Sequence, residues 1–122
     1  MIALALLLAF VQDPVRERLA SSPRHHEWVE VAIGERRVRT FVVYPEVKAK
    51  VPAVLVIHEN KGLSDWVRSV ADRLAEAGYV ALAPDLLSGA GPEANGRRGG
   101  TETFASADAA TKAIYDLDAT QV

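Results

Sequence analysis

Two short apolar runs dominate the pattern of hydrophobic and polar positions, AVLVI at 53–57 and YVALA at 79–83. Continuous apolar runs of this length are typical of strands that are buried on both faces of a parallel sheet. Between the runs, apolar residues recur at helical spacing and form one face, made of Val67, Val70, Ala71, Leu74 and Ala75. The pattern therefore predicts a strand–helix–strand unit with parallel strands and a right-handed crossover.

The predicted helix has clear signals at both ends. Ser64 is a favourable N-cap residue, and Asp65 places a negative charge in the first turn, where the helix dipole favours it. Gly78 follows the last apolar position and suits the C′ role that ends a helix. The polar residues that lie off the apolar face are Arg68, Asp72, Arg73 and Glu76.

A hairpin pattern precedes this unit. From Trp28 to Tyr44 the side chains alternate with period two, and Gly34-Glu35 interrupts the alternation. This predicts an antiparallel hairpin that ends at Pro45.

The stretch before the hairpin, 13–26, is polar and predicts a linker with a short helical arm at 15–20. His25 and His26 are adjacent within this stretch, and we interpret them as solvated side chains rather than metal ligands.

The N-terminus carries an unbroken apolar run from Ile2 to Val11. Its length is too short to span a bilayer and matches the core of a secretory signal peptide. We therefore expect a leader over residues 1–20, with an uncertain boundary, and an exported protein, periplasmic or secreted, that is not inserted in a membrane after leader removal. The alternative is a buried N-terminal helix in a cytoplasmic protein.

After the second apolar run, residues 88–103 predict a loop with five glycines and the pair Arg97-Arg98. A last helix is expected to begin at Thr101 or Thr103, with Asp108 and Lys112 as an i,i+4 pair. Its weaker apolar stripe consists of Phe104, Ala107, Thr111, Ile114 and Tyr115. Four strands are too few to cover two such apolar strands, so 21–122 is expected to be the N-terminal portion of a larger α/β domain.

Composition and charge limit the classes of partner and of site that the sequence predicts. The chain is 49% hydrophobic and 25% charged, with a net charge of −2, which gives no reason to expect nucleic acid or an anionic membrane as a partner. The absence of cysteine excludes disulfides, thiolate zinc sites and a cysteine nucleophile within these residues.

Candidate chemistry gathers directly after the first apolar run, at His58, Glu59 and Asn60. Loops at the carboxyl ends of parallel strands are where ligands bind in α/β sheets. His58-Glu59 lacks the second histidine of H-E-x-x-H, so we expect no metal. The turn leads into a helix N-terminus, which leaves a small anionic ligand as a weak alternative. No G-x-S-x-G is present, and these residues assemble no catalytic triad.

The segments 52–59, 62–63 and 70–86 resemble the dienelactone hydrolase family of α/β-hydrolases. The resemblance covers about residues 28–118 and implies a partial α/β-hydrolase fold, a β-hairpin followed by a βαβ unit, with the sheet incomplete in this chain. It also implies hydrolysis of a small ester or lactone through an acyl-enzyme intermediate, without a cofactor. The nucleophile, the acid and the histidine of the triad lie further along such a chain.

Two positions match the functional residues of that family. Glu59 corresponds to an accessory carboxylate near the nucleophile, and Asn60 to a position whose backbone N–H contributes to the oxyanion hole. The arginine that binds a substrate carboxylate in the family prototype has no counterpart after Pro84-Asp85-Leu86, and Arg97 or Arg98 would be a substitute. Two alternatives stay open: Glu59 as a structural carboxylate, and the chain as a non-catalytic flavodoxin-like module for a small anion. His58 is interpreted as structural.

Overall fold

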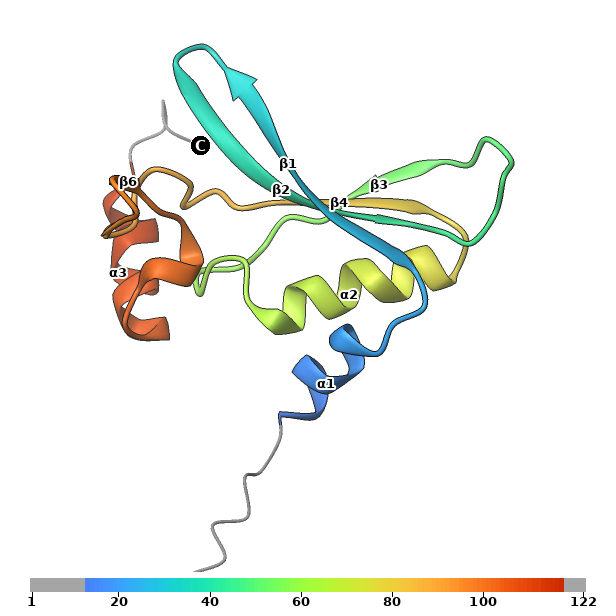
Figure 1. The fold of residues 1–122 in the computed structure, drawn as a ribbon. Helices are drawn as coiled ribbons and strands as arrows, with labels where there is room; N and C mark the ends of the chain where they lie inside the picture. Colours follow the sequence, from blue (N-terminus) through green and yellow to red (C-terminus); the bar gives the residue numbers. More distant parts are fainter. Residues whose placement is uncertain (1–12, 118–122) are drawn as a thin grey trace, which may run out of the picture.

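The computed structural model describes residues 13–117 (Figure 1). Residues 1–12, which carry the apolar run of the expected leader, and residues 118–122 lie outside the described part. In chain order the elements are α1 (Pro14–Ala20), β1 (His25–Ile33), β2 (Arg36–Tyr44), β3 (Ala53–Leu55), α2 (Asp65–Glu76), β4 (Val80–Pro84), β5 (Glu93–Ala94), β6 (Arg97–Arg98), the 3-10 turn η1 (Thr101–Thr103) and α3 (Ala107–Asp116). No helix between residues 13 and 117 has the length and apolar character needed to cross a membrane.

The main sheet has the strand order β1-β2-β4-β3. β1 and β2 form the predicted antiparallel hairpin, β2 pairs antiparallel with β4, and β3 pairs parallel with β4. α2 lies against one face of the sheet, and α1 lies on the far side of α2 (Figure 1). The predicted strand–helix–strand unit with parallel strands is therefore present, and the described residues form a mixed α/β structure.

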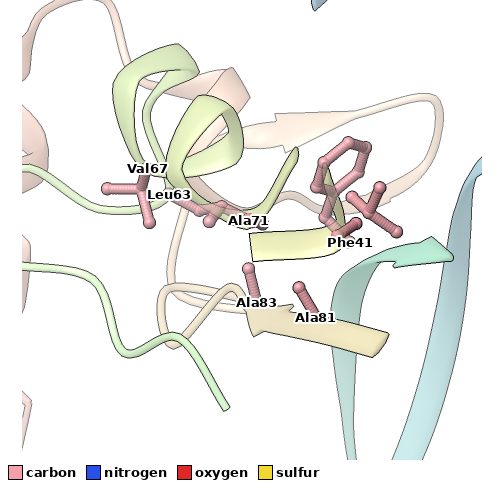
Figure 2. Packing of buried hydrophobic residues seen from close by; sticks show 8 residues of the cluster. Phe41, Leu63, Val67, Ala71, Ala81 and Ala83 are labelled. Atoms are coloured by element: carbon pink, nitrogen blue, oxygen red, sulfur yellow. The ribbon is translucent and has the colours of Figure 1, made fainter. Parts of the chain in front are cut away.

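The core lies between α2 and this face of the sheet. Val67, Ala71 and Ala75 of the predicted apolar stripe are buried against Phe41 and Val43 of β2 and against Ala81 and Ala83 of β4. Figure 2 shows α2 above these strand residues. The side chains in β4 at the contact are small, so the helix backbone approaches the sheet closely.

The C-terminus of α2 follows the Schellman pattern. The N–H of Gly78 donates to the carbonyl of Ala75 (3.0 Å), and the N–H of Tyr79 donates to the carbonyl of Leu74 (3.1 Å). Gly78 has φ +102°, a conformation that glycine adopts at no steric cost. Because the N–H of Tyr79 is used by the helix, β4 begins at Val80, one residue later than predicted.

The prediction that the first apolar run is buried on both faces is wrong for the described residues. β3 is only three residues long and lies at the edge of the sheet. Val56 packs against the core beneath α2, but Leu55 and Ile57 point to the other face and are 62% and 57% exposed. Among residues 13–117, the helices α1 and α2 cover one face only, so alternate residues of this run stay exposed.

The C-terminal segment also differs from expectation. The loop at 88–103 contains the two-stranded β5–β6 hairpin, closed at Asn95-Gly96, where both residues have positive φ. α3 begins at Ala107, not at Thr101 or Thr103, because Ser106 is its N-cap and accepts a hydrogen bond from the N–H of Ala109. Lys112 pairs with Asp116 instead of Asp108, and Tyr115 of the expected stripe is 74% exposed.

The segment expected to be a linker is anchored by a buried carboxylate. Asp72 of α2 is 2% exposed, although the helical pattern placed it off the apolar face. It accepts hydrogen bonds from Ser22 (2.6 Å) and Arg24 (2.6 and 3.1 Å), and it lies 2.7 Å from Nε2 of His26. The prediction that His26 is a solvated side chain is therefore wrong. Its neighbour His25 is exposed, as predicted. α1 covers the side of α2 that faces away from the sheet, and Asp72 connects α2 to the segment between α1 and β1.

These contacts control the ionisation of Asp72. Burial by itself raises the pKa of this carboxyl, but the hydrogen bonds from Arg24, Ser22 and His26 and the charge of Arg24 outweigh it and lower the pKa to about 2. The reference value is 3.8, so the folded state binds the proton less readily than the unfolded chain does. The resulting stabilisation is complete above the unfolded-state value and is lost as the pH falls through the folded-state value.

We predict that Asp72→Asn removes this pH dependence. In the wild type, acidification from about pH 5 to about pH 2 should remove about 2 kcal/mol of the free energy of unfolding through Asp72, and the variant should not show that component. At neutral pH the variant should be less stable by about 3 kcal/mol, because the guanidinium of Arg24 stays buried without its counter-charge. Urea denaturation at several pH values measures both effects, with the exposed Asp108→Asn on α3 as the control. Equal acid profiles for the wild type and Asp72→Asn would contradict the assignment.

Candidate functional site

The candidate site lies where the chain leaves β3, at the same edge of the sheet as the end of β4. The last backbone hydrogen bond between the two strands runs from the N–H of Val56 to the carbonyl of Leu82 (2.7 Å). The chain then forms the turn that contains His58, Glu59 and Asn60 before Ser64 caps α2. Two segments hold this turn in place, the residues that follow β4 and the turn η1.

His58 connects the turn to the residues after β4. Its side chain is fully buried, its Nε2 accepts the N–H of Leu86 (2.9 Å), and its Nδ1 lies 2.7 Å from the carbonyl oxygen of Glu59. An acceptor at Nε2 and a donor at Nδ1 assign the neutral imidazole protonated on Nδ1. Both ring nitrogens are occupied by main-chain groups, which supports the interpretation of His58 as structural.

A second connection runs from Asp85 through Thr101. The carboxylate of Asp85 is 1% exposed and accepts hydrogen bonds from the N–H of Leu87 (3.1 Å), the N–H of Thr101 (2.8 Å) and the hydroxyl of Thr101 (2.7 Å). The same hydroxyl oxygen accepts the N–H of Leu63 at 2.9 Å. One buried carboxylate therefore positions the residue after β4, the turn η1 and the end of the candidate turn.

Gly62 is required at the close approach of these segments. The N–H of Gly62 donates to the carbonyl of Glu59 (3.2 Å) and closes the turn, with φ +79° at Gly62. A Cβ at this position would overlap the hydroxyl of Thr101. Backbone conformation and space both exclude a side chain here.

Glu59 and Asn60 each have a polar group without a partner among residues 13–117. Glu59 is exposed, and its carboxylate accepts no hydrogen bond from any residue between 13 and 117. The backbone N–H of Asn60 likewise has no acceptor within that range, while its side-chain amide donates to the hydroxyl of Tyr115 at 3.4 Å. A carboxylate that held the helix N-terminus would show such bonds, but Ser64 has that role in α2.

A cavity of about 230 Å³ opens beside these two groups. His58, Glu59 and Asn60 form one wall, and the apolar side chains of Leu86, Ile114 and Leu117 form the other. The arrangement places Glu59 and Asn60, each with an unpaired polar group, opposite an apolar wall. Such a pocket suits a small neutral molecule with one polar group, such as the acyl portion of an ester.

The arginines considered as substitutes for a carboxylate-binding residue are not in this cavity. Arg97 pairs with Glu30 (2.9 Å), and Arg98 donates to the carbonyl of Ala90 (2.9 Å). Both line a different cavity, formed by the β1–β2 hairpin and the loop at 88–103. Residues 13–117 also contain no group of three or more histidine, aspartate or glutamate side chains that could hold a metal ion.

Several residues that build the site were not among the candidates from the sequence. Asp85 follows an apolar strand in the same way as Glu59, and this position could have identified it. Thr101, Ile114 and Leu117 are distant in the chain and have no motif. Only the fold brings them to the turn.

We predict that Gly62→Ala destabilises the protein more than Gly96→Ala does. Both glycines have nearly the same φ (+79° and +81°), but a Cβ at Gly96 meets nothing within 4 Å. Gly96→Ala should therefore cost about 1–2 kcal/mol from backbone conformation alone. Gly62→Ala adds the overlap with Thr101 and should also accelerate hydrogen exchange of the Leu63 amide, measured by NMR. Equal destabilisation by both substitutions would contradict the proposed close contact.

Comparison with known proteins gives matches to several hydrolases. Over 59 residues the chain is 51% identical to a protein of Escherichia coli K12 named as hydrolase fragment YghX, a match that covers 48% of the chain and 50% of that protein. Over 52 residues it is 48% identical to a protein of Saccharolobus solfataricus named as a carboxymethylenebutenolidase (43% and 20%). Over 63 residues it is 36% identical to a protein of Bradyrhizobium named as a 2-oxo-3-(5-oxofuran-2-ylidene)propanoate lactonase (51% and 25%).

The matched segments thus span half or less of the length of each of these relatives. The sequence model of the Dienelactone hydrolase family matches residues 38–121, well over half of the 122-residue chain, and includes β4, α2 and the whole candidate turn. The chain therefore belongs to the dienelactone hydrolase family.

Proposed function

We propose that this chain forms the oxyanion-loop part of an active site that hydrolyses a small carboxylic ester or lactone. The observation that carries the proposal is the unpaired N–H of Asn60 beside the exposed carboxylate of Glu59, at the mouth of an apolar cavity. Two separate connections, through His58 and through Asp85 and Thr101, hold the turn from both sides. A donor that is fixed before the reaction stabilises developing charge without reorganisation.

In the proposed reaction the acyl group lies against Leu86 and Ile114, and its carbonyl oxygen points to the N–H of Asn60. Attack by a nucleophile converts the carbonyl to a tetrahedral oxyanion, and the Asn60 N–H donates to that oxygen. In α/β-hydrolases the second donor is the N–H after the nucleophile. One such donor contributes about 100- to 1,000-fold to kcat.

The nucleophile, the acid and the histidine are proposed to come from a part of the protein outside these 122 residues. The chain contains no cysteine and no G-x-S-x-G, and its buried histidine has both ring nitrogens engaged. The acyl-enzyme intermediate would then form on that other part. In this proposal Glu59 lies near the nucleophile and controls its protonation before the substrate binds.

The names of the relatives support a lactone or ester as the substrate class, since one is named as a carboxymethylenebutenolidase and another as a lactonase. The apolar wall of the cavity agrees with that class. A flavodoxin-like module for a small anion has less support, because the matching family and the relatives reported above are those of hydrolases.

Export remains a proposal as well. α1 lies within the range expected for the leader, yet Leu19 is buried and Arg16 pairs with Asp65 of α2 at 3.1 Å. We therefore place the proposed cleavage before α1 rather than at residue 20. Determination of the N-terminal residue of the protein recovered from cells tests this boundary.

We predict that Glu59→Gln lowers kcat for ester hydrolysis by the full-length protein by at least about tenfold, which corresponds to about 1.4 kcal/mol. The change removes one charge from an exposed side chain without other contacts, so the thermal midpoint should stay unchanged. Hydrolysis of a p-nitrophenyl ester and of a small lactone measures the effect, and Glu76→Gln at the end of α2 is the control. Unchanged kinetics would show that Glu59 is a structural carboxylate. A full-length protein without hydrolase activity would overturn the proposal.

A further inference from the structure

A second cavity, of about 540 Å³, lies between the free end of the β1–β2 hairpin and the excursion that contains β5 and β6. The two segments are far apart in the chain, and Figure 1 shows the β6 region beneath the hairpin end. The ion pair between Arg97 and Glu30 joins them directly (2.9 Å). None of the residues that line this cavity lines the apolar cavity at Asn60.

The walls of this cavity are unusually rich in arginine. Five guanidinium groups line it, from Arg36, Arg37, Arg39, Arg97 and Arg98. Three carboxylates, those of Glu30, Glu35 and Glu102, line it as well, which leaves an excess of two positive charges. The whole chain has a net charge of −2, so the positive charge is concentrated at this location.

Within residues 13–117, carboxylate partners are present for two of the five arginines. Arg39 pairs with Glu102 at 2.8 Å, and Arg97 pairs with Glu30. Arg36 donates to the main-chain carbonyls of Leu86 and Ser88, which fixes its position without neutralising its charge.

The other two arginines are the most available. Arg98 donates to the carbonyl of Ala90, and the side chain of Arg37 has no hydrogen-bond partner among residues 13–117. Both residues are exposed, so neither is required for the packing of the core.

We propose that this arginine-lined cavity binds a small oxyanion with two negative charges, held by Arg37 and Arg98. Guanidinium groups bind carboxylate and phosphate oxygens in planar, bidentate geometry, and the excess of two charges matches a dianion. The volume accommodates a molecule larger than inorganic phosphate. The shared chemistry is that of a dicarboxylate or a phosphate monoester.

The existing ion pairs give the proposal a second consequence. Glu30 and Glu102 occupy two guanidinium groups and repel an incoming anion. Neutralising either glutamate should release an arginine and tighten anion binding, while loss of an arginine should weaken it. General electrostatic attraction would not distinguish arginines in the cavity from arginines elsewhere.

Isothermal titration calorimetry of the full-length protein at low salt, with inorganic phosphate and separately with succinate, tests the proposal. We expect saturable binding of at least one of them, weakened about tenfold by Arg37→Gln and by Arg98→Gln. Arg73→Gln on α2 removes the same charge outside the cavity and should leave binding unchanged. Glu30→Gln and Glu102→Gln should each tighten binding severalfold. Thermal midpoints of all variants identify any that fail to fold.

Binding of succinate alone identifies dicarboxylate chemistry, and binding of phosphate alone identifies phosphate chemistry. Either result supports the proposal, as does binding of both. The absence of saturable binding of both anions overturns it. So does a loss of affinity in Arg73→Gln that equals the loss in Arg37→Gln, because the attraction would then be a property of net charge and not of this cavity.

Discussion

The buried carboxylate of Asp85 is the interaction on which the functional edge of this protein depends. Removing an ionised carboxylate from water is costly unless hydrogen-bond donors replace the lost solvent. Here the main chain at Leu87 and both donors of Thr101 do so, and the Thr101 hydroxyl then accepts the N–H of Leu63. The requirement to satisfy one charge therefore determines the paths of three segments. The positions of Glu59 and Asn60 follow from that arrangement and from the bonds of His58 to the N–H of Leu86 and the carbonyl of Glu59.

A second buried carboxylate, that of Asp72, connects α2 to the N-terminal segment. Asp72 accepts hydrogen bonds from Arg24 and Ser22 and lies beside His26 at the start of β1. The first carboxylate positions a site, whereas the second closes the N-terminal segment over the helix. The two cavities also differ in the charge of their lining residues. The cavity beside Asn60 has an apolar wall and one carboxylate, while the cavity beneath the hairpin end contains an excess of guanidinium groups.

Local patterns predicted the elements of this fold well, and contacts between distant residues explain the errors. Ser64, Gly78 and the apolar stripe of α2 mark that helix because caps and spacing act within a few residues. The burial of Asp72 could not be predicted, since the helical pattern does not reveal that α1 covers a second face. The exposure of Leu55 follows from the helices α1 and α2 covering one face of the sheet, and an apolar run does not specify which faces are covered. At the site, Glu59 and Asn60 were located from their place after a strand, but the role of Thr101 required the fold, because it is 38 residues from its partner Leu63.

The strand order also has a kinetic consequence. β1 and β2 are joined by a tight turn, so their pairing closes a short loop, and hairpins of this kind form in about 1–10 μs. The pairing of Thr40 with Pro84 instead closes a loop that includes β3 and α2, and such non-local contacts form more slowly because of the entropy of loop closure. We therefore expect a folding order in which the hairpin exists first, with Phe41 and Val43 in water until α2 and β4 arrive. During that interval the free edge of β2 is the part of the chain most open to pairing with the wrong strand.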